Sequence, residues 1–153
     1  MDSSTGITFL DFTEKDRQRL LEAYVYIRPS IPAILEKFYD SLRQIGAGPE
    51  TYGVNPDALK TRQVEHWRRL FQGNFNRDYE NTARRIAIRH YEIGLSHDLY
   101  VLSYMRVLLL FSEVICRADG LERTHAREMM DSVAKAISID MVHALSPYTG
   151  DLV

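Results

Sequence analysis

Hydrophobic residues recur at intervals of three and four along most of the chain, which is the spacing of one face of an α-helix. The alternation of polar and apolar residues that marks a half-buried strand is absent. The pattern therefore predicts an all-α fold of about six helices.

Capping residues, prolines and glycines mark the ends of these helices. Thr13 is a candidate N-cap, with Glu14 and Asp16 in the turn that follows, and Pro29 ends or kinks this first helix. Ser96 is a second candidate N-cap. We expect a single domain over 13–146, a flexible segment over 1–12 and a tail over 147–153. The other predicted helices cover about residues 31–42, 56–73, 76–94, 97–118 and 121–145.

The last two predicted helices are apolar on more faces than a single small core needs. The stretch from Val101 to Ile115 is apolar nearly all round, and the final helix carries apolar residues off its main stripe. A helix of this kind is either the most buried element of its fold or is shared with a second subunit. The pattern leaves both alternatives open.

Composition narrows the class of protein. The 153 residues are 45% hydrophobic and 26% charged, as in an ordinary soluble domain, and the formal net charge of -2 indicates no basic surface for nucleic acid. The polar start does not match a signal peptide, and the longest apolar run, Val107 to Phe111, is too short to cross a bilayer. We therefore expect a cytoplasmic protein with no nucleic-acid or membrane partner.

Several kinds of site chemistry find no support in the sequence. No serine lies in a Gly-x-Ser-x-Gly motif, and the single cysteine, Cys116, can form neither an internal disulfide nor a zinc cluster. None of the five histidines has another histidine four residues away, so no helical metal-binding pair is present. The remaining candidate is a histidine that acts alone.

His90 lies in an apolar stripe of the helix predicted over 76–94. Neutral imidazole ligates iron well, and an apolar wall keeps a porphyrin dry, so this stripe is typical of a haem-binding helix. The alternative is a core histidine whose ring bonds to a backbone carbonyl. The other members of the stripe are Ala83, Ile86, Ala87 and Ile93.

Two polar residues interrupt apolar stripes elsewhere. Tyr39 lies at the edge of the stripe of helix 31–42, and Gln63 lies within the stripe of helix 56–73. A phenol or an amide in a closed pocket can donate a hydrogen bond to a gas molecule bound at haem. Alternatively, Tyr39 is a core aromatic with its hydroxyl at the rim, and Gln63 extends into solvent.

Two segments at a fixed separation carry a family resemblance. Leu-Phe-x-Gly occurs within the segment from Trp67 to Gly73, and His-x-x-Ile-Gly-Leu begins at His90. Together with Leu59-Lys60 and Tyr100, they make about residues 15–145 resemble the sensor domain of globin-coupled sensors. That family includes haem-based aerotaxis transducers and oxygen-responsive diguanylate cyclases. One departure is the loop after Leu95, where the family often has a proline and a Trp-Tyr pair and this chain keeps only the tyrosine.

The resemblance implies a globin-like fold with a shortened helix set, the sensor globin. It implies that haem b, iron protoporphyrin IX, lies between the third and fourth predicted helices, with His90 as the proximal metal ligand and Tyr39 as the distal tyrosine. The second distal position falls near Arg62 or Gln63. The residues expected to bind the cofactor are His90, Tyr39, Gln63, Trp67, Phe38, Ile86, Ile93 and Tyr100.

The implied function is that of a gas sensor rather than an enzyme. O2, CO or NO binds at the haem, and the ligation state passes through a homodimer of the last two helices to an effector domain. Such an effector would be a diguanylate cyclase, a chemotaxis transducer or a kinase, and no effector motif occurs in these residues. The alternatives are a haem globin that carries oxygen or acts as a nitric oxide dioxygenase, and a helical interaction module without haem.

Overall fold

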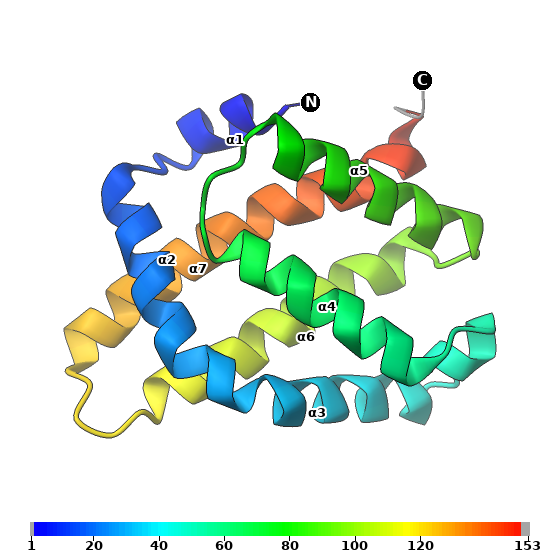
Figure 1. Cartoon of the computed structure of the whole chain (residues 1–153), viewed down its shortest axis with the longest axis horizontal. Coiled ribbons are helices and arrows are strands. Elements are labelled where there is room, and N and C mark those ends of the chain that lie inside the picture. Colours follow the sequence, from blue (N-terminus) through cyan, green and yellow to red (C-terminus); the bar gives the residue numbers. More distant parts are fainter. Residues whose placement is uncertain (1, 151–153) are drawn as a thin grey trace.

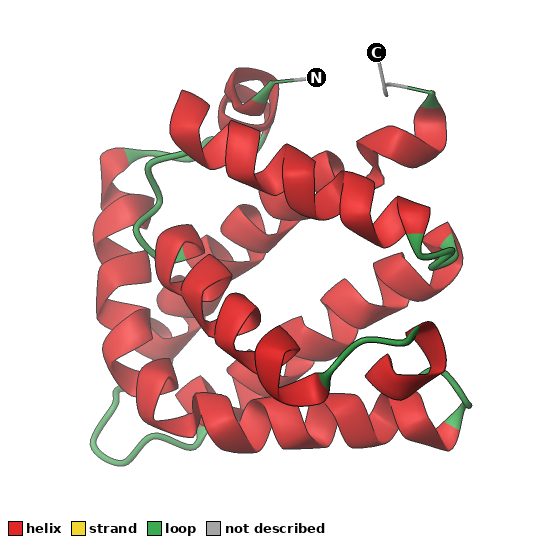
Figure 2. Cartoon of the chain, turned by 45° about the vertical axis from the view of Figure 1, so that its right-hand side comes forward, coloured by secondary structure: helices red, strands yellow, loops and turns green. Residues whose placement is uncertain are grey.

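The computed structural model describes residues 2–150, which form helices and connecting loops with no strand (Figure 2). This confirms the all-α prediction. The α-helices are α1 (Ser3–Phe9), α2 (Glu14–Ile27), α3 (Ile31–Gln44), α4 (Pro56–Leu70), α5 (Arg77–Glu92), α6 (His97–Cys116) and α7 (Arg123–Leu145). Three short 3-10 helices cover Arg28–Ser30, Pro49–Tyr52 and Ser146–Thr149.

Side-chain caps explain where several helices begin. Asn55, Asn76 and Ser96 each accept a hydrogen bond from a backbone N–H in the first turn of α4, α5 and α6, at 2.9, 2.9 and 3.3 Å. At the start of α2, the backbone N–H of Thr13 donates to the Asp16 carboxylate at 2.9 Å. These bonds satisfy backbone donors that the helices themselves leave free. The turns that separate α3, α4, α5 and α6 are therefore encoded locally.

Helix α1 lies within the segment that we expected to be flexible, and here the structure differs from that expectation. Asp2 caps the helix by accepting a hydrogen bond from the backbone N–H two residues later, at 3.1 Å. Ser3 is buried and shares a 2.8 Å hydrogen bond with Nε2 of His143 on α7. A Cβ added at Gly6 would lie 3.2 Å from the side chain of Ile139, so α1 packs closely on α7. Because its Ser, Thr and Gly residues have weak helix propensity, contacts with α7 stabilise α1.

The expected C-terminal tail is only partly described. Its residues 147–149 belong to the 3-10 helix Ser146–Thr149, and the hydroxyl of Tyr148 donates to the carbonyl of Leu95 at 2.6 Å. This bond brings the end of α7 to the loop between α5 and α6. Residues 151–153 lie outside the described residues.

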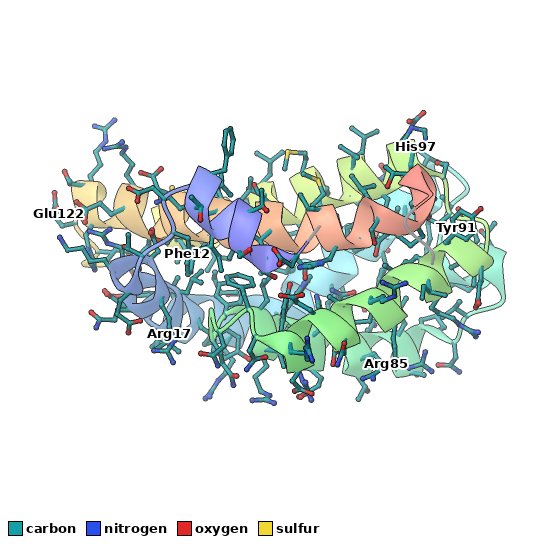
Figure 3. The ribbon with its side chains drawn as sticks, turned by 90° about the horizontal axis from the view of Figure 1, so that it is seen from above. Phe12, Arg17, Arg85, Tyr91, His97 and Glu122 are labelled. Atoms are coloured by element: carbon teal, nitrogen blue, oxygen red, sulfur yellow. The ribbon has the colours of Figure 1, made fainter. Side chains whose placement is uncertain are left out.

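The helices form two layers. Helices α4 and α5 lie in front in Figure 1, and α6 and α7 run behind them, while α2 and α3 occupy the left and lower edges. Figure 3 shows the same two layers from above. The core includes an aromatic cluster in which the ring of Phe111 meets the rings of Trp67 and Phe71 edge to face, at 5.0 and 5.4 Å. Helix α7 packs against α6, α2 and α5, and is therefore the central element.

Helix α6 has apolar residues both inside and outside this core. Leu102, Met105 and Leu109 are 64%, 37% and 62% exposed and lie on one face. Within residues 2–150, α6 alone is long and apolar enough to cross a membrane by length and composition, a test that a core helix of a soluble protein also passes. The other face carries the buried residues Tyr100, Val107, Leu110, Phe111 and Ile115.

Candidate functional site

A cavity of about 470 Å³ lies between α3, α4, α5 and α6, and reaches α7. In Figure 1, α3 lies below this region and α5 above it, with α4 in front and α6 behind. The volume falls within the range of roughly 300–1,000 Å³ that is usual for small-molecule and cofactor sites. All eight residues expected to bind a cofactor line it, namely Phe38, Tyr39, Gln63, Trp67, Ile86, His90, Ile93 and Tyr100. The structure thus brings together residues from four helices that the sequence separates.

Helix α5 directs His90 into the cavity. The small side chains of Ala83 and Ala87 are buried and allow α5 to pack closely on α7. Because His90 lies three and seven residues further along the helix, it falls on the same inward stripe as these alanines. Ile86 and Ile93 extend that stripe along the cavity wall.

The ring of His90 is held in one orientation and one tautomer. Its Nδ1 lies 2.8 Å from the carbonyl oxygen of Ile86, and a carbonyl only accepts, so Nδ1 carries the proton. The ring also stacks on Tyr100, with 4.9 Å between ring centroids. Burial lowers the pKa of His90, which favours the neutral ring. Nε2 then has a free lone pair, and it makes no hydrogen bond within residues 2–150.

This arrangement is the one that a metal-ligating histidine needs. Ligating imidazoles commonly donate their second N–H to a carbonyl or carboxylate, which fixes the ring and its tautomer. No group of three or more histidine, cysteine, aspartate or glutamate residues that could hold a bare ion occurs in the described part of the chain. A metal at His90 would therefore need a cofactor to supply its other ligands. The apolar wall and the single free imidazole nitrogen of His90 fit a haem.

Tyr39 presents an unpaired phenol at the same cavity. Its side chain is 1% exposed, so its hydroxyl does not lie at the rim, which was the alternative interpretation. Burial raises the pKa of Tyr39 to about 12, so the hydroxyl stays protonated at neutral pH and can donate. Gln63 and Arg62 also line the cavity, on α4. Arg62 and Gln63, the two candidates for the second distal residue, are therefore both part of the cavity wall.

Only two buried side-chain nitrogen or oxygen atoms in residues 2–150 lack a hydrogen-bond partner. They are the hydroxyl oxygen of Tyr39 and Nδ1 of His66, and both residues line the cavity. Buried polar groups in folded proteins are paired in the large majority of cases. Two unpaired groups at one cavity are therefore a sign that the cavity receives a ligand.

A buried carboxylate connects the cavity wall to the central helix. Asp140 of α7 is 3% exposed and accepts hydrogen bonds from three other helices. Nε2 of His66 on α4 donates to it at 3.0 Å, and the hydroxyl of Tyr104 on α6 donates at 2.7 Å. The hydroxyl of Tyr79 on α5 donates to the same carboxylate. Asp140, His66 and Tyr104 also line the cavity, so this cluster forms part of its wall.

Contacts between Asp140 and its three donors determine which members of this cluster are charged. Burial by itself would raise the pKa of Asp140, but the His66 ring and the two phenols outweigh burial, and the pKa lies below its usual value. Burial by itself would lower the pKa of His66, but the Asp140 carboxylate outweighs it and raises the pKa. Burial is also the main cause that raises the pKa of Tyr79 and of Tyr104, so both remain donors. The carboxylate thus stays ionised because three donors surround it.

Asp140 and His66 are two of the site residues that sequence reasoning missed. Both interrupt apolar stripes, Asp140 between Ile137 and Ala144 and His66 beside Trp67. The same signal drew attention to Tyr39 and Gln63, and it could have identified this pair as well.

Comparisons with known proteins bear on the family and the fold of this chain. The model of the Protoglobin family matches residues 5–152. The fold is also similar to the globin domain of a Geobacter sulfurreducens globin-coupled sensor, with a TM-score of 0.81 and 19% sequence identity over 95% of this chain and 96% of that chain. No match was found among curated proteins.

Replacing Asp140 with alanine should lower the free energy of unfolding by about 3–5 kcal/mol, because three buried donors lose their acceptor. Urea denaturation followed by circular dichroism measures this change. Asp131→Ala is the matched control on the same helix, since Asp131 is exposed and pairs only with exposed Arg127. The control should stay within about 1 kcal/mol of the unmodified chain. Equal losses in the two variants would contradict the role assigned to Asp140.

Proposed function

Because the chain belongs to the Protoglobin family, we propose that it is a haem-based gas sensor domain in which His90 ligates the iron and Tyr39 contacts the bound gas. The proposed cofactor is haem b, and the proposed ligands are O2, CO and NO. The domain has no catalytic role of its own in this proposal. It is cytoplasmic and acts without nucleic acid or membrane.

The observation that carries this proposal is the state of His90. Its Nδ1 proton is committed to the Ile86 carbonyl, and its Nε2 lone pair is free in a cavity of cofactor size. A core histidine that only satisfied its own polar groups would not need a cavity beside its second nitrogen. Haem iron, when bound, supplies the site at which a diatomic gas attaches.

The other cavity residues would orient His90 and keep the site dry. Tyr100 stacks on the imidazole at an interplanar angle of 24°, which restricts rotation of the ring. Tyr39 holds a protonated hydroxyl inside the cavity, where it can donate to a polarised gas molecule. Gln63 supplies a second polar group on α4. Phe38, Trp67, Ile86 and Ile93 would supply an apolar wall against the cofactor.

The proposed output is a rearrangement of a homodimer formed by α6 and α7. A gas shifts a signalling equilibrium only by its different affinity for the two states, so a group near the iron must differ between them. Tyr100 stacks on His90 and lies on α6, the helix that also carries exposed Leu102, Met105 and Leu109. Movement of the His90 ring would therefore act on the helix that presents the interface. The receiver would be an effector such as a diguanylate cyclase, a chemotaxis transducer or a kinase.

The haem site is tested by an absorption spectrum of the haem-reconstituted protein. We expect a Soret band that shifts on exposure to O2 or CO and that His90→Ala weakens or displaces. Because the alanine leaves space at the iron, added imidazole should restore the original band in this variant. His97→Ala, which changes an exposed histidine, is the control and should keep the original spectrum. Absence of a Soret band, or a band unaffected by His90→Ala, would favour a helical interaction module without haem.

The distal role of Tyr39 is tested by Tyr39→Phe. Loss of one hydrogen bond to bound oxygen should speed O2 dissociation by roughly tenfold and change the rate of autoxidation. Stopped-flow and spectral decay measurements give the two rates. Tyr52→Phe, at a partly exposed tyrosine of the same cavity, should leave them unchanged. Unchanged kinetics in Tyr39→Phe would rule out its distal role.

The dimer is tested by placing a charge on the exposed stripe of α6. Leu109→Glu should convert a dimer into a monomer in analytical ultracentrifugation, because a carboxylate at the centre of an apolar interface loses its hydration. Val25→Glu, at a 70% exposed position of α2, should remain a dimer. A monomeric unmodified chain, or a dimeric Leu109→Glu variant, would contradict this interface.

A further inference from the structure

Tyr148 lies where the C-terminal 3-10 helix meets the end of α5. It belongs to the 3-10 helix Ser146–Thr149, which contacts both α5 and α7. Figure 3 shows Tyr91 and His97, which flank the turn between α5 and α6, at the same end of the molecule as the red end of the ribbon. The segment that follows α7 thus reaches the turn that comes directly after His90.

The hydroxyl of Tyr148 holds the residue that closes this turn. It donates to the carbonyl of Leu95 at 2.6 Å. The backbone N–H of Leu95 in turn donates to the carbonyl of His90 at 3.3 Å. Between them, Gly94 has a φ of 84°, a left-handed conformation that is common at the end of a helix and that glycine adopts without steric cost. Leu95 therefore connects Tyr148 to the backbone of His90 through two hydrogen bonds.

The ring of Tyr148 contacts two further neighbours of His90. It meets the ring of Tyr91 edge to face, with 5.2 Å between centroids, and the ring of Tyr100 at 6.2 Å and an angle of 74°. Edge-to-face pairs at these separations are favourable. Tyr91 follows His90 in the sequence, and Tyr100 stacks on the imidazole. One side chain thus contacts residues that hold His90 both through its backbone and through its ring.

The orientation of a metal-ligating imidazole depends on such surrounding groups. Residues that position a ligand change the properties of the metal site without touching the metal. Tyr148 does so from a segment that lies 53 residues beyond Leu95 and continues directly from α7. The position of His90 and the docking of this segment are therefore physically linked.

We propose that Tyr148 is a positioning residue for His90 and that it couples gas binding to the docking of the C-terminal 3-10 helix. This inference rests on the proposed function above. With the helix docked, the bond to Leu95 restrains the turn after His90, so the imidazole adapts less readily to a bound gas. The docked state then binds gas more weakly than the undocked state, and a gas shifts the equilibrium toward undocking. Such coupling is reciprocal by thermodynamic necessity.

The test compares the haem-reconstituted unmodified chain with Tyr148→Phe, which keeps the ring and removes the hydroxyl. Resonance Raman spectra of the ferrous, gas-free protein should show a shifted iron–histidine stretching band in the variant. The affinity for CO, obtained from association and dissociation rates, should rise roughly two- to fivefold, as the loss of one restraining hydrogen bond allows. Tyr148→Ala, which also removes the contacts with Tyr91 and Tyr100, should produce a larger rise.

Docking of the helix is measured by amide hydrogen exchange. The N–H of Gly150 donates to the carbonyl of Ser146 and reports on the 3-10 helix, and the N–H of Leu95 reports on the turn after His90. In the unmodified chain, CO should speed exchange at both amides. Tyr148→Phe should speed exchange without CO and remove most of the effect of CO. In the haem-free protein, the same variant should already speed exchange at Leu95, a measurement that needs no bound gas.

Tyr26→Phe is the matched control. Tyr26 is also a half-buried tyrosine, but it lies on α2 and outside the cavity wall. Its replacement should leave the Raman band, the affinity for CO and the exchange rates unchanged. The same shifts in Tyr26→Phe as in Tyr148→Phe would overturn the specific role of Tyr148.

The remaining outcomes separate this inference from the proposed function. Failure of the unmodified chain to bind haem would overturn the proposed function itself. Haem binding with an unchanged band and affinity in Tyr148→Phe would overturn the role of Tyr148 and leave the haem proposal intact. A changed affinity without any effect of CO on exchange would overturn the coupling, since reciprocity requires both. An unchanged Soret intensity in Tyr148→Phe shows that the variant is folded and holds its haem.

Discussion

The buried carboxylate of Asp140 is the interaction on which the shape of the cavity depends. An ionised carboxylate without partners inside a protein is strongly unfavourable, so Asp140 requires its three donors to be in place together. These donors come from α4, α5 and α6, and Asp140 itself lies on α7. The four helices can therefore satisfy the carboxylate only at one set of relative positions. Asp140, together with the stacked rings of His66 and Tyr79, links α4 to α5 beside the cavity.

Helix α6 connects this carboxylate to His90. Tyr100 stacks on the imidazole, and Tyr104, one turn later on α6, donates to Asp140. The two tyrosines are themselves neighbours, with 5.4 Å between ring centroids. A displacement of His90 would thus reach α7 through directly packed aromatic rings and one hydrogen bond. His90 and α7 are therefore joined by an unbroken series of contacts. These contacts transmit a signal if the His90 end and the Asp140 end favour different arrangements of α6 and α7.

The sequence predicts the local features of this protein well and the long-range ones poorly. Helix starts at Asn76 and Ser96, and the inward stripe of His90, depend on residues within a few positions of each other. The contacts of Asp140 cross sequence separations of 74, 61 and 36 residues, and no local pattern encodes those pairings. Helix α1 is the clearest example, because its own sequence has weak helix propensity and its contacts are with α7. The candidate site falls between these cases, since each residue is recognisable within its own helix but the cavity exists only in the assembled fold.

The hydrogen bond from His90 to Ile86 does not by itself distinguish a core histidine from an iron ligand. In both cases Nδ1 donates to the carbonyl four residues earlier. The two cases differ at Nε2, which a core histidine also satisfies and which an iron ligand keeps free. Here Nε2 has no partner in the described chain, and the unpaired hydroxyl of Tyr39 belongs to the same cavity. A fold that leaves the buried Tyr39 hydroxyl on α3 and Nδ1 of His66 on α4 unsatisfied around one space loses stability unless something enters that space. The lost stability is the strongest physical argument that the cavity is a binding site.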